Sequence, residues 1–500
     1  MKPVRDLLKH SSIYAIGQIL TRMASVMLLP LYTNKLSPAD YGVTAILDLT
    51  SSILALLIGS GMATAVTRSH FDDDSESHRD RVWWTGLAFV SVAALCVLGP
   101  LWLGRQWLSD LTLGHSQIDG AWFYSLTLMT TWAYVIGNVC DTYLRVQKWS
   151  GTFVLISLLR LLLNIGLNVW FLVGLEMGIR GLLLGNLIAS VLYTVALLSV
   201  FVRTRGRVTI DMRVAKQMFR FSAPLVVTGL LCMLMHESDR YVVRMYGSME
   251  QVGVYSLAHK IGFAVHTLCL MPFISIWHVA IYDIERQPNA KNLFSRIFTG
   301  FVSGLGVLLL GASLIVHPVL PLLTPDAYGD AIELVSVILL GFFFFGLQIQ
   351  FEVPALLSKR TQLMVPGSVL GVIVNIAGNL LLVPVMGVWG AAWIGVATYA
   401  VSSLTIYAMC RNVYRIEYPW TRSLLTIAGL VATYLSVRFG VFPKTGFWGQ
   451  VAVSIAVCAV WASALVGKDL LEWWQSRQES SVDVIEHSKV PGPSRDLTRV

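Results

Sequence analysis

About fourteen apolar runs, each about 20 residues long, follow one another along the chain with short polar segments between them. A run of this length spans a bilayer as an α-helix. Inside the hydrocarbon, only helices and closed barrels satisfy all of their backbone polar groups. The chain is 55% hydrophobic and 13% charged, whereas proteins average about 25% charged residues. The sequence therefore predicts an all-α polytopic membrane protein with about 14 transmembrane helices.

The expected spans are 11–33, 42–67, 82–103, 121–143, 152–173, 181–202, 221–245, 252–276, 293–317, 331–353, 363–385, 388–410, 422–439 and 447–467. The first run is too long for a signal peptide and is followed at once by a second span, so we interpret it as a transmembrane helix. Residues 469–500 are polar and contain Pro and Ser, which predicts a mostly disordered tail.

The basic residues indicate the orientation of these spans. If both termini are cytoplasmic, the cytoplasmic segments hold about five times as many Lys and Arg residues as the outer segments. This asymmetry supports an even number of spans. The net charge of +8 comes from basic residues between apolar runs and not from a block, so no nucleic-acid partner is expected.

An internal repeat is visible in the sequence. Its matches share one separation along the chain: Asn164-Ile-Gly-Leu-Asn168 with Asn375-Ile-Ala-Gly-Asn379, Asp141 with Glu352, Lys148 with Lys359, and Gly42 with Gly253. After a slip of two residues, Met177-Gly-Ile-Arg-Gly181 matches Met386-Gly-Val-Trp-Gly390. Six spans fall in each copy, so both copies have the same orientation in the membrane. Such copies are related by an axis along the membrane normal, and transporters place substrate sites at the repeat interface.

The repeat gives the expected domains. Residues 1–206 form an N-terminal six-helix lobe and residues 207–412 a C-terminal six-helix lobe. Residues 413–468 add two transmembrane helices, and residues 469–500 form the cytoplasmic tail.

Four charged residues lie between His236 and Tyr246, inside the seventh expected span. A charge near the bilayer centre costs about 2.5–3.5 kcal/mol on insertion scales, so it normally faces a wet cavity. Glu237, Arg240 and Arg244 are spaced i, i+3 and i+7, which places them on one face of a single helix.

Counting the helical rise from the expected outer boundaries places charged residues of three spans at one depth. They are Asp48 in the second span, Glu237, Asp239 and Arg240 in the seventh, and His259 and Lys260 in the eighth. The common depth indicates a polar chamber. Arg240 and Lys260 are candidate substrate-binding residues, and Asp48, Glu237 and Asp239 are candidates for the coupling proton or cation. The alternative is a set of ion pairs that only locks the three helices together.

Further polar residues lie in two spans of the first lobe. Arg22 is in the middle of the first span, and Arg160, Asn164 and Asn168 follow one stripe of the fifth. Arginine binds phosphate bidentately and stays charged when partly desolvated, so we expect these residues to bind an anionic headgroup. Alternatively, the arginines snorkel or pair and the asparagines bond a neighbouring helix. The second interpretation is preferred for the two matching asparagines of the second copy.

The sequence carries no nucleotide-binding or nucleophile motif, which predicts a transporter and not an enzyme, with no cofactor. Residues 70–78 contain acidic and His residues, but a short solvated loop is favoured over a metal site, and no metal is expected. The six cysteines lie in or at the ends of apolar runs without metal-type spacing, and we interpret them as small apolar residues.

Several short stretches resemble one family. Leu7-Leu-Lys-His-Ser-Ser-Ile-Tyr-Ala-Ile-Gly17, Leu29-Pro-Leu-Tyr-Thr33, Leu36-Ser-Pro-Ala-Asp-Tyr-Gly42, Asp239-Arg240 and Val252-Gly-Val-Tyr-Ser-Leu257 look like Wzx-type polysaccharide flippases. These belong to the multidrug/oligosaccharidyl-lipid/polysaccharide exporter superfamily. The resemblance covers essentially the whole chain. It implies a two-lobed transporter that moves undecaprenyl-diphosphate-linked oligosaccharide across a bacterial inner membrane by alternating access.

The resemblance also implies a biological setting: O-antigen, lipopolysaccharide, capsule or exopolysaccharide synthesis. Its implied partners are the polyprenyl-diphosphate-linked glycan, membrane lipid, a polysaccharide polymerase and a chain-length regulator. The alternative is a drug or cation antiporter of the same superfamily, for which an acidic cavity is expected. A membrane glycosyltransferase or polymerase would need a large soluble loop, and the internal loops here are under about twenty residues.

Overall fold

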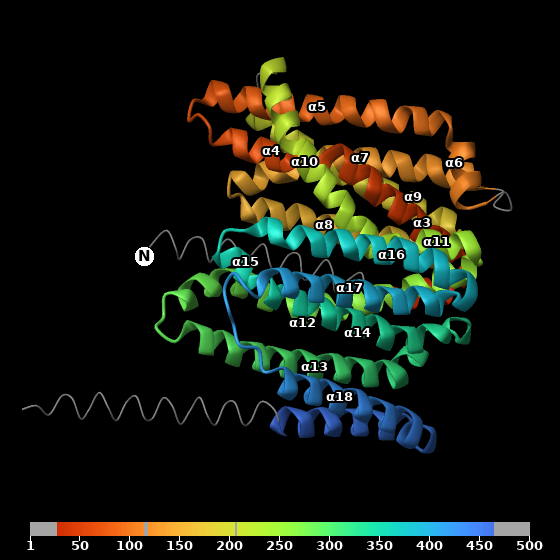
Figure 1. Ribbon diagram of the computed structural model, residues 1–500. Helices are drawn as coiled ribbons and strands as arrows, with labels where there is room; N and C mark the ends of the chain where they lie inside the picture. The colour runs from red at the N-terminus through yellow and green to blue at the C-terminus, as the bar shows by residue number, and fades with distance from the viewer. Residues whose placement is uncertain (1–27, 115–118, 206–207, 465–500) are drawn as a thin grey trace, which may run out of the picture. The chain divides into compact units, whose positions relative to one another are not determined.

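The computed structural model describes residues 28–114, 119–205 and 208–464, which are mainly helical and contain no strand. Twelve helices in this part of the chain are long and apolar enough to cross a membrane. A further helix, α7 (Gly120–Val146), is 27 residues long but more polar. Most of the expected first span lies outside the described residues, as does the tail. The predicted polytopic all-α class is confirmed (Figure 1).

The other helices up to α12 are α2 (Leu29–Lys35), α3 (Pro38–Ala55), α4 (Gly61–His70), α5 (Glu76–Leu103), α6 (Arg105–Thr112), α8 (Ser150–Val169), α9 (Gly178–Thr204), α10 (Met212–Glu237), α11 (Asp239–Tyr246) and α12 (Met249–Glu285). They are followed by α13 (Ala290–Leu323), α14 (Asp330–Phe351), α15 (Val353–Leu357), α16 (Val365–Met386), α17 (Val388–Cys410), α18 (Trp420–Ser436) and a last helix, Phe447–Ala464. A π-helical turn, Leu56–Ser60, joins α3 to α4 within one candidate span.

Contacts divide the chain into two compact units. Unit 1 comprises residues 1–268, 319–352 and 360–410, and unit 2 comprises residues 269–318, 353–359 and 411–500. Unit 2 has its own apolar cluster, formed by residues of α13, α18 and the turns after α18. The lobe boundaries expected from the repeat, after residues 206 and 412, stay a prediction.

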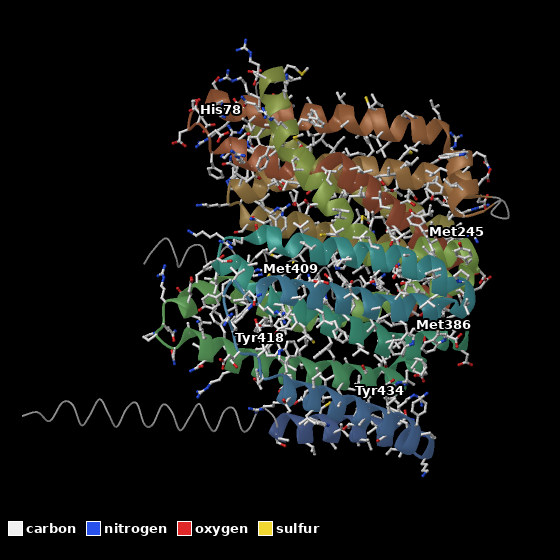
Figure 2. All side chains as sticks on the ribbon, viewed as in Figure 1. His78, Met245, Met386, Met409, Tyr418 and Tyr434 are labelled. Atoms are coloured by element: carbon white, nitrogen blue, oxygen red, sulfur yellow. The ribbon has the colours of Figure 1, made fainter. Side chains whose placement is uncertain are left out.

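The ends of the helices in unit 1 follow the predicted alternation. Met245 in α11 and Met386 at the end of α16 precede loops that were expected on the outer side, and both lie at the same end of the unit (Figure 2). His78, in the loop region expected on the cytoplasmic side, lies at the opposite end (Figure 2).

The backbone carries the internal repeat that the sequence predicts. Lys148 and Lys359 both adopt a left-handed conformation, with φ of 59° and 57°. Gly178 and Gly387, paired after the two-residue slip, have φ of 55° and 57°. Such values are uncommon outside glycine, and four of the six positive-φ residues among those described match in pairs at the spacing of the sequence repeat, whereas Gly114 and Glu176 have no such match. The two copies therefore share local structure as well as sequence.

The paired glycines of the repeat meet each other in unit 1. A Cβ atom on Gly42 would lie 3.0 Å from the backbone N of Gly253, and a Cβ on Gly253 would lie 3.0 Å from the backbone N of Gly42. Equivalent residues touch in this way only beside the axis that relates the two copies. The axis that relates the two copies therefore passes between α3 and α12 at this crossing.

The seventh expected span is not a single helix, and that part of the prediction is wrong. α10 ends at Glu237 and α11 begins at Asp239. The hydroxyl oxygen of Ser238 lies 2.6 Å from the carbonyl O of Leu234 and 2.8 Å from Oδ1 of Asn375 in α16, and its single proton can be donated to either acceptor. A serine hydroxyl can compete in this way with the helical hydrogen bonds of the backbone, so the break falls in the middle of the charged stretch.

Candidate functional site

A cavity of ≈ 410 Å³ lies in unit 1 beside the α10–α11 break. It is lined by Asp48, Leu49 and Ser52 of α3, Cys232, Met233, His236 and Glu237 of α10, Arg240 of α11 and Phe263 of α12. Ligand pockets commonly measure about 300–1,000 Å³. Both copies of the repeat contribute walls, which is the location expected for a transporter site.

The sequence positions α3 through its N-terminus. The Ser37 side chain accepts a hydrogen bond from the backbone N of Asp40 at 3.1 Å, and the Asp40 side chain accepts one from the backbone N of Ser37 at 3.2 Å. This capping box, with Pro38 at the first turn, fixes where the helix begins. Asp48 follows two turns later and is exposed to the cavity.

Arg240 is the cation of the cavity wall. Its Nη1 atom forms an ion pair of 2.6 Å with Oε2 of Glu237, and its Nη2 atom lies 3.0 Å from Nδ1 of His259. An arginine can only donate hydrogen bonds, so Nδ1 of His259 accepts and this imidazole is neutral. The side chain of Arg240 is 13% exposed and that of Glu237 is 29% exposed, so both can be reached from the cavity.

Asp239 and His259 do not face water as expected, because they are 4% and 7% exposed. Asp239 accepts a hydrogen bond from the hydroxyl of Tyr255 and another, of 2.9 Å, from the backbone N of Arg240. With His236 and Tyr399, both residues line a second space of ≈ 20 Å³, which is room for about one water molecule. The six charged residues expected at one depth are therefore neighbours, but they do not share one cavity.

Lys260 is half-buried near the larger cavity. Its Nζ atom lies 5.8 Å from the centroid of the Tyr32 ring and 5.9 Å from that of the Tyr41 ring, a distance at which cation–π attraction operates. Lys260 and Arg240 both act electrostatically on Asp48. The structure thus brings Asp48, Glu237, Arg240 and Lys260 together, as predicted from depth.

The asparagines of α8 bond neighbouring helices. Asn164 donates to Oδ1 of Asn186 in α9 at 2.9 Å, and Asn168 donates to the hydroxyl of Tyr32 at 2.9 Å. The guanidinium of Arg160 lies 4.6 Å from the centroid of the Tyr193 ring. None of these side chains lines the larger cavity, so the helix-bonding alternative describes the contacts of the asparagines. Tyr32 connects Asn168 to the surroundings of Lys260.

Two further basic residues from the sequence analysis, Arg22 and Arg244, are not part of the cavity wall that the structure describes. Arg22 lies outside the described residues, and its role stays a prediction. Arg244 donates from Nη2 to the carbonyl O of Leu113 at 2.5 Å and does not line the cavity. The expected common face of Glu237, Arg240 and Arg244 is therefore only partly realised, because Glu237 and Arg240 line the cavity and Arg244 does not.

The acidic loop 70–78 uses its polar groups locally. The indole N–H of Trp83 donates to Nδ1 of His70 at 3.0 Å, and Asp74 pairs with Arg79 at 2.7 Å. Hydrogen bonds from the backbone N–H and the hydroxyl of Ser75 lower the pKa of Asp73. In the described part of the chain, no three His, Cys, Asp or Glu side chains are grouped to hold a metal ion.

Sequence reasoning missed Ser52, His236, Tyr255 and Tyr399, which line the two spaces. His236 adjoins Glu237 in the sequence and could have been included. The others carry no local signal, because a Ser or Tyr within an apolar run is ordinary in membrane helices.

Comparison with solved structures identifies proteins with a similar fold. The lipid II flippase MurJ, in an inward closed conformation, superposes with a TM-score of 0.75 at 13% identity, over 93% of this chain and all of that one. A multidrug resistance MATE family transporter of the MOP superfamily, in an inward-facing conformation, superposes with a TM-score of 0.63 at 14% identity, over 82% of this chain and 96% of that one. A MOP superfamily transporter from Pyrococcus furiosus superposes with a TM-score of 0.51 at 14% identity, over 85% of this chain and 96% of that one. No curated protein matches the chain.

The protein is a multi-pass membrane protein with the fold of the MOP transporters and flippases. Its residues 35–276 match the model of a family described as polysaccharide biosynthesis protein. The matched segment contains the second to eighth expected spans, and therefore the whole wall of the larger cavity. The family resemblance inferred from the sequence is confirmed.

Proposed function

We propose that the protein is a flippase that moves polyprenyl-diphosphate-linked oligosaccharide across the bacterial inner membrane, with both termini in the cytoplasm. The observation that carries the proposal is Arg240, a cation in the wall of a cavity built by both copies of the repeat. The polysaccharide biosynthesis family over residues 35–276 and the fold of a lipid II flippase support the same conclusion.

The proposed mechanism starts with an exchange of partners at Arg240. Its guanidinium is engaged by Glu237 in the structure, and a diphosphate is a stronger bidentate acceptor than one carboxylate. The diphosphate displaces Glu237, with Lys260 as a second cation near the site. The glycan occupies the polar volume and the polyprenyl chain remains in lipid. The two copies then rock about the axis between α3 and α12, which exchanges access from one side to the other.

Coupling to an ion gradient is part of the proposal. Displacement of Glu237 leaves a carboxylate without its cation partner, beside Asp48 and near Asp239. Like charges in a desolvated site favour uptake of a proton or a cation. We assign the coupling ion to these three acids. Arg22, Arg160, Asn164 and Asn168 complete the proposed binding residues of the first copy.

The physiological setting proposed is O-antigen, lipopolysaccharide, capsule or exopolysaccharide synthesis, with a polymerase and a chain-length regulator as partners. A direct test uses purified protein in liposomes with a fluorescent polyprenyl-diphosphate oligosaccharide. We expect transfer between leaflets that stops when Arg240 is replaced by Ala. A protein that inserts at normal levels but moves no such lipid would contradict the proposal.

One observation favours a second candidate, a drug or cation antiporter. The cavity wall contains two carboxylates, of Asp48 and Glu237, against the single guanidinium of Arg240. This balance suits a cationic cargo. Export of quaternary ammonium dyes by the same liposomes, without transfer of the diphosphate lipid, would establish the antiporter.

A further inference from the structure

The repeat pairs two acidic residues whose neighbours differ. Asp141, near the end of α7, forms an ion pair of 2.6 Å with Arg145 and accepts a hydrogen bond of 3.1 Å from the hydroxyl of Tyr193. Arg160, stacked on the Tyr193 ring, adds a second positive charge within electrostatic reach. These cationic partners favour the charged form of the carboxylate and oppose the effect of its burial.

Glu352 directly follows α14 and has neutral neighbours. Its Oε1 atom accepts a hydrogen bond of 2.9 Å from Nε2 of Gln348, whose own side-chain oxygen accepts one of 3.1 Å from Ser402 in α17. The thiols of Cys232 in α10 and Cys410 in α17 are titratable groups within its electrostatic reach. Across the described ranges, no Lys or Arg side chain lies within ion-pair distance of Glu352.

The sequence repeat shows which residues account for the different surroundings of Asp141 and Glu352. The three partners of Asp141 are replaced in the second copy by groups that carry no charge: Arg145 by Leu356, Arg160 by Gly371 and Tyr193 by Ser402. The packing leaves no room for an arginine at position 371, because a Cβ atom there would lie 2.9 Å from Sδ of Met235 and 3.3 Å from Cβ of Ser402. The second copy has thus kept the acid and lost each of its counter-charges.

We propose that Glu352 binds and releases a proton during the transport cycle, in addition to the acids of the larger cavity. A half-buried carboxylate without a counter-ion relies on water for its charge, so excluding water favours the neutral acid and admitting water favours the anion. Motion of α10 or α17 against α14 changes that access. Cys232 is within electrostatic reach of Glu352 and also lines the larger cavity, which links the acid to the state of the cavity. The assignment rests on the proposed transporter function.

The charge of Glu352 can be measured without transport through alkylation of Cys232, which is exposed. The probe is N-ethylmaleimide, added to a full-length variant in which the other five cysteines are replaced by Ser. The thiolate is the reactive form, and a nearby negative charge disfavours it. We expect an inflection in the pH–rate profile where Glu352 ionises, with the rate lowered about threefold above it. Glu352→Gln should remove the inflection, Glu352→Asp should keep it, and Asp141→Asn, the matched control, should leave it unchanged.

Transport in the same liposomes gives a second readout. Glu352→Gln should transport with a rate that responds more weakly to an imposed pH gradient than that of the parent, while Asp141→Asn retains the full dependence. Identical alkylation profiles for the parent and Glu352→Gln would overturn the proposal, as would an unchanged response to the gradient. If the parent protein moves no diphosphate lipid, the proposed function fails, and the alkylation profile still decides whether Glu352 titrates.

Discussion

At the scale of single residues, Arg240 has three partners, and the contribution of each can be tested by substitution. It pairs with Glu237, lies against His259 and is in electrostatic contact with Asp239. A charge-assisted hydrogen bond contributes about 1.5–3 kcal/mol. Replacement of Arg240 by Ala should therefore weaken binding of a diphosphate lipid about 10- to 100-fold, and Lys should restore only part of it because it cannot bind bidentately.

The measurement is equilibrium binding of a labelled polyprenyl-diphosphate lipid to detergent-solubilised protein. Arg244→Ala is the matched control, since Arg244 lies one turn further along α11 and does not line the cavity. Wild-type affinity in Arg240→Ala would remove Arg240 from the binding site.

Glu237 competes with the ligand for Arg240 in the proposed exchange. Glu237→Gln removes the negative charge and keeps the shape of the side chain, so the diphosphate should bind several-fold more tightly. The coupling of transport to a proton or sodium gradient should weaken in the same variant. Glu250→Gln, at an exposed acid of α12, is the control. Weaker ligand binding in Glu237→Gln would show that the carboxylate helps the ligand and does not compete with it.

At the scale of elements, the crossing of α3 and α12 depends on glycine. A methyl group on Gly42 would press on the carbonyl O of Met249 as well as on the backbone of Gly253. Alanine is a better helix former than glycine by about 1 kcal/mol, so Gly42→Ala should not harm the helix itself. It should instead force α3 and α12 apart, increase labelling of an introduced outer-loop cysteine and slow transport. Gly395→Ala in α17, where nothing lies within 4 Å of the new methyl, should behave as the wild type.

A second element-scale expectation concerns the α10–α11 break. Asn375 in α16 contacts this break twice. Its Oδ1 atom is an acceptor for the hydroxyl of Ser238, and its Nδ2 atom donates to the carbonyl O of Met235 at 3.3 Å. Asn375→Leu removes both of these hydrogen bonds at a buried position, and a typical hydrogen bond contributes about 0.5–1.5 kcal/mol. The melting temperature of the purified protein should fall. Asn379→Leu should be milder, because the side-chain amide of Asn379 donates to Asn375 within α16; equal losses would contradict this role of Asn375.

At the scale of the whole molecule, alternating access requires the two copies to separate at the end that is closed in the structure. In unit 1 the hydroxyl of Thr33 donates to the carbonyl O of Leu323 at 3.2 Å, and the hydroxyl of Tyr328 donates to the carbonyl O of Leu36 at 3.0 Å. A short reducible cross-link between cysteines introduced at positions 33 and 323 should stop transport, and reduction should restore it. Unimpaired transport by fully cross-linked protein would rule out opening at this end.

The sequence by itself determined the class of the protein and much of its symmetry. Spans of about 20 apolar residues leave the backbone no alternative to helices in a membrane, and paired motifs such as Asn164 with Asn375 identified the repeat. The backbone then showed the same pairing in the conformations of Lys148 and Lys359. Depth counting also brought Asp48, Glu237, Arg240 and Lys260 together, because helical rise is constant along a span.

Only the tertiary structure decided which of these groups share a cavity. The break at Ser238 depends on Asn375, a residue more than a hundred positions away, so periodicity within the span could not predict it. Burial of Asp239 against Tyr255 and of His259 beside Phe342 likewise depends on helices distant in sequence. A sequence pattern fixes the face and depth of a side chain on its own helix. The partner that occupies that face is set by the packing of other helices, which decides whether a charge meets water, a counter-ion or an aromatic ring.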